Sequence, residues 1–82
     1  MKIQLRLFAS LRQKLPPGSS AGQCDLELPD RTTIGEVLER IDIPPASAQM
    51  VLVNGDQGRD LDRILNHGDV LSIFPPLAGG SL

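Results

Sequence analysis

Two stretches in the first third of the chain alternate apolar and polar residues, which is the period of a half-buried β-strand. The first covers residues 2–8 and puts Ile3, Leu5 and Leu7 on one side. The second covers residues 23–28 and shows the same alternation before a Pro-Asp pair. Each stretch therefore predicts a strand with one face against a core and the other toward solvent.

The pattern then changes to the spacing of a helix. Thr33 and Glu36 fit a capping box, in which each side chain accepts a hydrogen bond from the backbone of the other residue. The apolar residues that follow at helical intervals are Ile34, Val37, Leu38 and Ile41. We expect this helix to end before Pro44, because the residue preceding a proline disfavours the helical conformation.

The second half of the chain predicts two more strands, at residues 50–53 and 70–74. Asn54-Gly55, directly after the first of them, is a strong signal for a tight turn. The Pro- and Gly-rich residues 16–22 predict a loop. Shorter elements are predicted as helical turns at 9–15 and 61–65 and as an edge strand at 58–60.

Runs of strands around one helix predict an α+β fold, with a mixed sheet of four to five strands and the helix packed across one face. A β-grasp domain has this order, with its first and last strands parallel and adjacent at the centre of the sheet. Phe8 and Phe74 are then expected at the same end of neighbouring strands, as an exposed apolar patch. Such a patch marks a partner site or covers a sheet edge, and the pattern leaves both open. Residues 1–74 form the predicted domain and residues 75–82 an extended tail.

Composition excludes several classes of protein. At 82 residues, with 40% apolar and 22% charged residues, the chain is one small globular domain. A net charge of −2 with scattered Lys and Arg lacks the electrostatic signature of a protein that binds nucleic acid or a membrane surface. One Cys excludes an internal disulfide, and no apolar run approaches the roughly 20 residues of a membrane span. Since the start also lacks a signal-peptide pattern, we expect a cytoplasmic protein.

No group of residues has the composition of a catalytic or metal site. His67 lacks a second His or a nearby Cys, which favours a solvated turn residue over a ligand. Cys24 lies on the inward side of its strand and is expected to be a structural thiol. Gly55 and Gly58 lack the Gly-Lys-Ser/Thr sequence of a phosphate-binding loop. The expected solvent side of the helix consists of Glu36, Glu39, Arg40 and Asp42. We therefore expect no bound metal or cofactor.

The candidate chemistry lies in the tail. Pro75-Pro76 fixes the backbone in an extended form at its root, and beyond it the side chains shrink through Leu77 and Ala78 to Gly79-Gly80. Extended glycine can enter a channel that rejects a side chain, and a glycine carboxylate has no Cβ to hinder attack at its carbonyl. Such a tail suits a reacting group that is carried into another protein. A glycine-rich frayed terminus is the alternative.

Several segments, taken in order, carry a resemblance to a known family. They are Leu5-Arg6-Leu7-Phe8-Ala9, Leu11-Arg12, 33–38, 51–55, Gly68-Asp69-Val70 and 74–80. Together they resemble the MoaD/ThiS family of ubiquitin-like sulfur carriers, and most closely its branch of molybdopterin synthase small subunits. The ordered set, which ends in Phe-Pro-Pro-x-Ala-Gly-Gly, is more specific than any one segment.

The resemblance implies a function that depends on partners. In this family an E1-like adenylating enzyme uses ATP to activate the terminal glycine carboxylate, and a sulfur donor converts the adenylate to a thiocarboxylate. The tail then enters the large subunit of molybdopterin synthase, which holds the catalytic residues. Gly80 is thus implied to carry the sulfur, and Gly79 to keep the tail thin. Contacts with partners are implied for Phe8, Phe74, Pro75, Pro76, Leu77 and Ala78.

One departure from the family concerns Ser81 and Leu82, because the working form of the family ends at Gly-Gly. While these residues remain, Gly80 has an amide carbonyl that cannot be adenylated as a carboxylate. Either a peptidase trims them, or they are foreign to the natural chain, or this copy carries no sulfur. Three functions stay open: a sulfur carrier for molybdopterin, a sulfur carrier for thiamine or another sulfur metabolite, and a non-catalytic interaction module or protein modifier.

Overall fold

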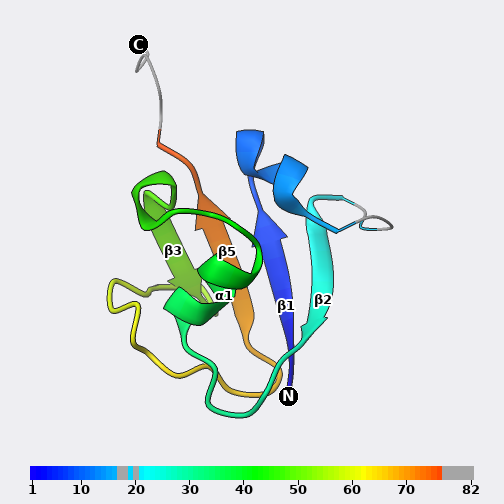
Figure 1. Cartoon of the computed structure of the whole chain (residues 1–82), viewed down its shortest axis with the longest axis vertical. Coiled ribbons are helices and arrows are strands. Elements are labelled where there is room, and N and C mark those ends of the chain that lie inside the picture. Colours follow the sequence, from blue (N-terminus) through cyan, green and yellow to red (C-terminus); the bar gives the residue numbers. More distant parts are fainter. Residues whose placement is uncertain (17–18, 20, 77–82) are drawn as a thin grey trace.

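The computed structural model describes residues 1–16, 19 and 21–76. In this part of the chain one five-stranded mixed sheet has the strand order β2-β1-β5-β3-β4, and helix α1 lies across one of its faces (Figure 1). The strands are β1 (Lys2–Leu7), β2 (Gln23–Glu27), β3 (Met50–Val53), β4 (Asp56–Gln57) and β5 (Val70–Phe74). The helices are α1 (Ile34–Arg40) and two short 3-10 helices, η1 (Ala9–Lys14) and η2 (Pro45–Ser47). The α+β class and the β-grasp order of elements are confirmed.

The first and last strands pair in parallel, as predicted, and β5 is the middle strand of the sheet. Leu5 lies opposite Leu71, and Leu7 lies opposite Ile73. All four side chains are at most 1% exposed, so the core forms directly on this pair of strands. Burying an apolar side chain of this size stabilises a fold by about 1.5–3 kcal/mol.

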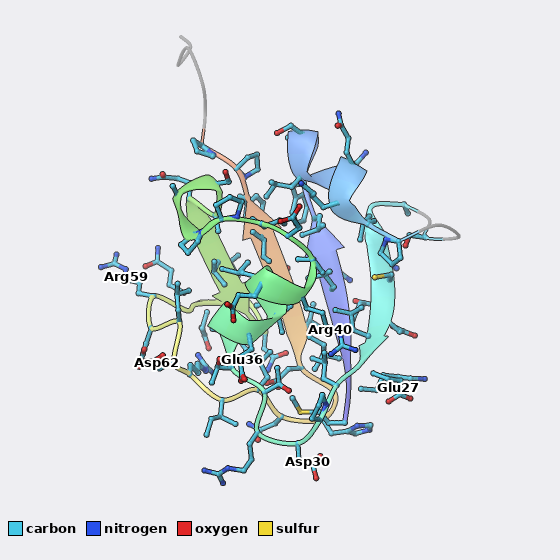
Figure 2. All side chains as sticks on the ribbon, viewed as in Figure 1. Glu27, Asp30, Glu36, Arg40, Arg59 and Asp62 are labelled. Carbon is cyan, nitrogen blue, oxygen red and sulfur yellow. The ribbon has the colours of Figure 1, made fainter. Side chains whose placement is uncertain are left out.

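Helix α1 begins at the predicted capping box. The Glu36 N–H donates to Thr33 Oγ1 at 3.2 Å, and the Thr33 N–H donates to Glu36 Oε1 at 2.9 Å. The helix buries Ile34, Val37 and Leu38 against the sheet. Its polar side faces solvent as expected, and Figure 2 shows Glu36 and Arg40 on it.

The predicted edge strand at residues 58–60 is wrong, because the short strand β4 comes earlier. Asn54 and Gly55 both have positive φ, at 54° and 89°, which is the geometry of a two-residue hairpin turn. Such a turn pairs the very next residues, so Val53 lies opposite Asp56 and Leu52 opposite Gln57.

The helical turn predicted at residues 61–65 is also wrong. The backbone there makes one local turn bond, from the Arg63 N–H to the Asp60 carbonyl at 3.0 Å, and otherwise bonds to the segment before and at the start of α1. The Ile34 N–H donates to the Arg63 carbonyl at 3.1 Å, and the Leu65 N–H donates to the Thr32 carbonyl at 2.9 Å. These long-range bonds use the groups that a local helix needs.

A buried carboxylate, Asp69, connects two turns that are far apart in the sequence. Its Oδ1 accepts the side-chain amide of Asn54 at 2.9 Å, and its Oδ2 accepts the Asn66 N–H at 2.8 Å. The Asn54 Oδ1 in turn accepts the Val70 N–H at 2.8 Å. Asp69 is only 9% exposed, so both of its oxygens are satisfied inside the protein. The network fixes the β3–β4 turn against the start of β5.

We predict that Asp69→Ala lowers the free energy of unfolding by about 2 kcal/mol, because it leaves the Asn54 amide and the Asn66 N–H without an acceptor. Urea unfolding followed by far-ultraviolet circular dichroism measures the change. Asp56→Ala is the control, since Asp56 is an exposed acid on β4, and it should change stability by less than about 0.5 kcal/mol. Equal losses in the two variants would contradict a structural role for the network.

None of the helices in the described ranges is both long enough and apolar enough to cross a membrane.

Candidate interaction site at the root of the tail

The chain's two aromatic side chains stack on each other where β1 and β5 end. The ring centroids of Phe8 and Phe74 are 4.2 Å apart and the ring planes differ by 10°. The two residues are more than 60 positions apart in the sequence. The β-grasp order predicted that the two residues meet at the same end of neighbouring strands. The structure confirms this prediction.

Backbone bonds on both sides hold this pair in place. The Phe8 N–H donates to the Ile73 carbonyl at 3.3 Å, which extends the β1–β5 pairing by one step. Directly after it, Ala9 has a φ of 52°, and the chain turns there into η1. A non-glycine residue in this left-handed region costs about 1–2 kcal/mol, so the turn after Phe8 is imposed by its surroundings.

A third apolar side chain, Met50, belongs to the same site. Met50 lies opposite Phe74 in the antiparallel β3–β5 pair and is 44% exposed. We call Phe8, Phe74 and Met50 the outer apolar patch, because they lie on the sheet face away from α1. The sequence pattern missed Met50. Its position on a short apolar strand gave no sign of the register that sets it beside Phe74.

The patch is less open than the sequence suggested. Phe8 and Phe74 are each half-buried, since each ring covers one face of the other. Met50 supplies the most exposed surface of the three. An aromatic pair braced in this way presents a rigid apolar surface, which loses little conformational freedom when a partner binds.

The tail leaves the domain directly beside this patch. The Phe74 carbonyl accepts the Gln49 N–H at 2.9 Å. Pro75, which follows, has no N–H with which to continue the sheet. Pro75 is half-buried and Pro76 is exposed. The residues assigned to the rest of the tail, Leu77, Ala78, Gly79, Gly80, Ser81 and Leu82, lie outside the described residues, so their assigned roles stay predictions.

The other candidate residues have structural surroundings. Cys24 is half-buried and packs against the core, as a structural thiol would. Partial burial raises the pKa of the Cys24 thiol, a hydrogen bond with Ser19 lowers it, and the nearby Asp25 carboxylate raises it. His67 is exposed, and its Nδ1 accepts the Lys2 N–H at 3.0 Å. Among the described residues, no three His, Cys, Asp or Glu side chains come together as a metal site would require.

Comparison with known proteins identifies the family. The ThiS family profile matches residues 5–80, from the first strand through the paired glycines. The chain belongs to the ThiS family. Small archaeal modifier protein 3 of Haloferax volcanii is a relative with 31% identity over 96 aligned positions, which cover 98% of this chain and all of the relative. The 96 aligned positions exceed the 82 residues of this chain, so the relative has insertions, but the match still spans nearly the whole length of both proteins.

Solved structures confirm the ubiquitin-like β-grasp fold. The crystal structure of SAMP1 from Haloferax volcanii superposes with a TM-score of 0.70 at 23% identity, covering 98% of this chain and 100% of that one. A chain of the complex of subunits 1 and 2 of molybdopterin-converting factor from Helicobacter pylori gives 0.61 at 18% identity, with 98% and 100% coverage. At these identities the likeness shows the fold alone.

We predict that a double-mutant cycle of Phe8→Ala and Phe74→Ala gives a coupling free energy of about 0.5–1.5 kcal/mol, because the two rings stack directly. Chemical denaturation of the wild type, both single variants and the double variant measures it. The matched pair Phe8→Ala and Ile64→Ala should be additive within about 0.5 kcal/mol, since Ile64 is an exposed apolar residue elsewhere. Additive effects for the two phenylalanines would contradict the stacked arrangement.

Cys24 should react with a disulfide reagent at pH 8 more slowly than N-acetylcysteine does, and the difference should disappear in urea. The folded state raises the pKa of this thiol, so it holds the proton at a pH where the unfolded thiol loses it. The resulting contribution to stability is present below the unfolded pKa and is lost as pH rises through the folded pKa. Equal rates for the folded protein and the model thiol would overturn this prediction.

Proposed function

We propose that this chain is a ubiquitin-like carrier whose Gly80 is activated by an ATP-dependent, E1-like partner and then bears a thiocarboxylate, in the manner of a molybdopterin synthase small subunit. One observation carries the proposal: the match to the ThiS family continues through Gly79 and ends at Gly80. The tail's root beside a rigid apolar patch supports it, because an extended tail needs a fixed base to be delivered into a partner.

The chemistry balances without a reactive side chain from this chain. A Gly80 carboxylate oxygen attacks the α-phosphorus of ATP, pyrophosphate leaves, and an acyl-adenylate forms. A hydrosulfide ion supplied by a donor protein then attacks the carbonyl carbon, AMP leaves with the electrons of the C–O bond, and loss of the sulfur-bound proton gives the thiocarboxylate. Each step needs a carbonyl open to attack, which glycine offers because it has no Cβ. The sulfur is finally transferred in the active site of a large subunit.

A protein modifier is the second candidate, and one observation favours it. The curated relative described above is a small archaeal modifier protein, and it matches this chain over its full length. In that function a lysine amine of a target protein replaces sulfur as the nucleophile, and Gly80 ends in an isopeptide bond. The activation step is the same, so the two functions differ only in the acceptor. A sulfur carrier for thiamine or another metabolite differs in turn only in the final recipient.

All these functions require Gly80 to become a terminal residue. Ser81 and Leu82 must be removed first, because Gly80 has no carboxylate to attack ATP while it is amide-bonded to Ser81. A trimming peptidase is therefore part of the proposal. Two glycines before the cleavage point suit such an enzyme, since residues without side chains fit a narrow substrate channel.

Purification from the native host should yield a form ending at Gly80 whose mass lies about 16 Da above that of its carboxylate, because sulfur replaces one oxygen. Intact-mass spectrometry measures both species. Gly80→Ala is the matched variant and should lose most of the heavier species, since its methyl group hinders passage and attack. A host that holds the pathway enzymes yet gives only the full-length chain would refute the proposal. Lysine-linked Gly80 peptides after proteolysis would favour the modifier instead.

A further inference from the structure

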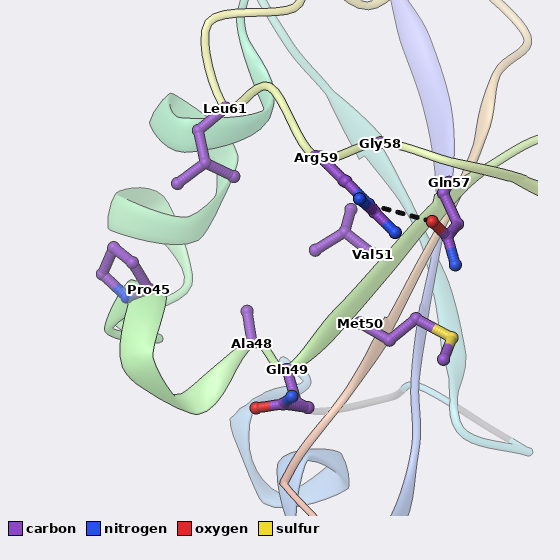
Figure 3. Close-up of a pocket in the computed structure, with 9 residues that line it drawn as sticks. All are labelled: Pro45, Ala48, Gln49, Met50, Val51, Gln57, Gly58, Arg59 and Leu61. Atoms are coloured by element: carbon purple, nitrogen blue, oxygen red, sulfur yellow. Dashed lines mark hydrogen bonds between the residues drawn. The ribbon is translucent and has the colours of Figure 1, made fainter.

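An open hollow lies beside β3, at the edge of the sheet that the short strand β4 does not cover (Figure 3). Its volume is about 460 Å³. It is formed between η2 and the segment that follows β4, and none of the residues that form it belongs to the outer apolar patch except Met50. The volume falls within the range of sites that bind ligands and peptides.

The hollow exists because the chain turns away from the edge of the sheet soon after the short strand β4. Gly58 is buried, and a Cβ added to it would come within 3.1 Å of Ile34 Cδ1 and 3.2 Å of Val53 Cγ2. A Cβ at this position would force these two side chains to shift by a few tenths of an ångström, so glycine favours the close passage of the backbone over the core. The departing segment leaves Val51 and Leu61 lining the hollow with apolar atoms (Figure 3).

One charged side chain, Arg59, stands at the hollow, among lining residues that are otherwise apolar or uncharged. Its Nε donates to Gln57 Oε1 at 3.0 Å, which holds the guanidinium in place (Figure 3). Both ion pairs found in the described part of the chain involve other cations. The remaining N–H groups of Arg59 match a carboxylate, which a guanidinium binds through two parallel hydrogen bonds.

The surroundings of Arg59 suit one carboxylate better than a polyanion. Asp60 and Asp62 follow closely in the chain and are exposed. Figure 2 shows Asp62 on the same side of the domain as Arg59. With the exposed Arg63, the segment 59–63 holds two cations and two anions, so it has no excess of positive charge to attract a phosphate chain. A peptide with an apolar side chain and a single acid meets the apolar wall and the cation together.

The hollow also adjoins the root of the tail. Gln49 and Met50 line it. The Gln49 N–H donates to the Phe74 carbonyl, and Met50 pairs with Phe74. A protein that holds the tail at Phe74 therefore reaches the hollow one strand away. We propose that an extended segment of the activating enzyme binds here, with an apolar side chain in the hollow and a carboxylate on Arg59. This inference rests on the proposed function.

The test measures ATP–pyrophosphate exchange by the activating enzyme of the native host, with the full domain ending at Gly80 as substrate. Arg59→Glu should raise the KM for this substrate at least about tenfold and leave kcat within about twofold, because the variant loses a charge-assisted contact remote from the glycine. Pro45→Glu places a carboxylate on the opposite wall and should act in the same direction. The controls are Arg63→Glu and Ala46→Glu, which make matched changes at exposed residues that do not line the hollow.

Each outcome decides either the binding of the activating enzyme at the hollow or the proposed activation of Gly80. A raised KM for Arg59→Glu and Pro45→Glu, with both controls close to wild type, supports the inference. Wild-type KM values for these two variants overturn it while leaving the activation of Gly80 intact. Equal effects in the controls also overturn it, because a general charge effect then explains the change. If the wild-type form ending at Gly80 supports no exchange at all, the proposed function itself fails.

Discussion

The parallel pairing of β1 with β5 is the constraint on which the rest of the molecule depends. It joins the first and last strands of the domain, so it closes nearly the whole chain into one loop. Loop closure of this length is entropically costly and is repaid only when the buried face of both strands is covered. Helix α1 supplies that cover, and β2 and β3 protect the two open sides. The site at the tail exists because this pairing places Phe8 next to Phe74.

Alternation along these strands gives the two faces of the sheet different functions. The inner face carries Leu5 and Ile73 into the core, while the outer face carries Phe74, which is half-buried against Phe8. A slip of one residue along β5 would turn Phe74 toward the core and Ile73 toward the outer face. The hydrogen bonds of Asp69 oppose such a slip, because they fix the start of β5 against the turn after β3. The register of β5 therefore decides both which residues enter the core and which residues form the outer apolar patch.

Local signals in the sequence predicted what depends on local geometry. Strand alternation, the Thr33–Glu36 capping box and the Asn54-Gly55 turn each act over a few residues, and each was confirmed. The segment 61–65 failed because its backbone bonds to a part of the chain about 30 residues earlier, which no local pattern records. Met50 was missed for a related reason, since its exposure beside Phe74 depends on register.

The hollow at Arg59 was even harder to predict from local patterns in the sequence. Its walls come from η2, from β3 and from the segment after β4, and its shape depends on the buried Gly58. The sequence marked Gly58 only as a glycine without a phosphate-loop motif. A hollow that forms because no strand covers part of the sheet edge leaves no residue pattern of its own in the sequence. The aromatic pair was predicted because the β-grasp order of strands brings Phe8 and Phe74 to the same end of the sheet. The roles assigned to residues 77–82 stay predictions, since these residues lie outside the described part of the chain.

In the functions proposed above, selectivity among partners must come from the folded body, because these functions share the chemistry at the glycine. The proposed activation of Gly80 is the same whether the acceptor is sulfur or lysine, and two glycines offer no side chain for discrimination. The root of the tail is flanked by two unlike surfaces, a braced apolar patch on the outer face and an apolar hollow with a cation at the edge. A partner that contacts both fixes the direction in which the tail leaves the domain. Proteins that match only one surface would bind the tail weakly or in the wrong direction, so two small sites discriminate better than a single larger apolar face.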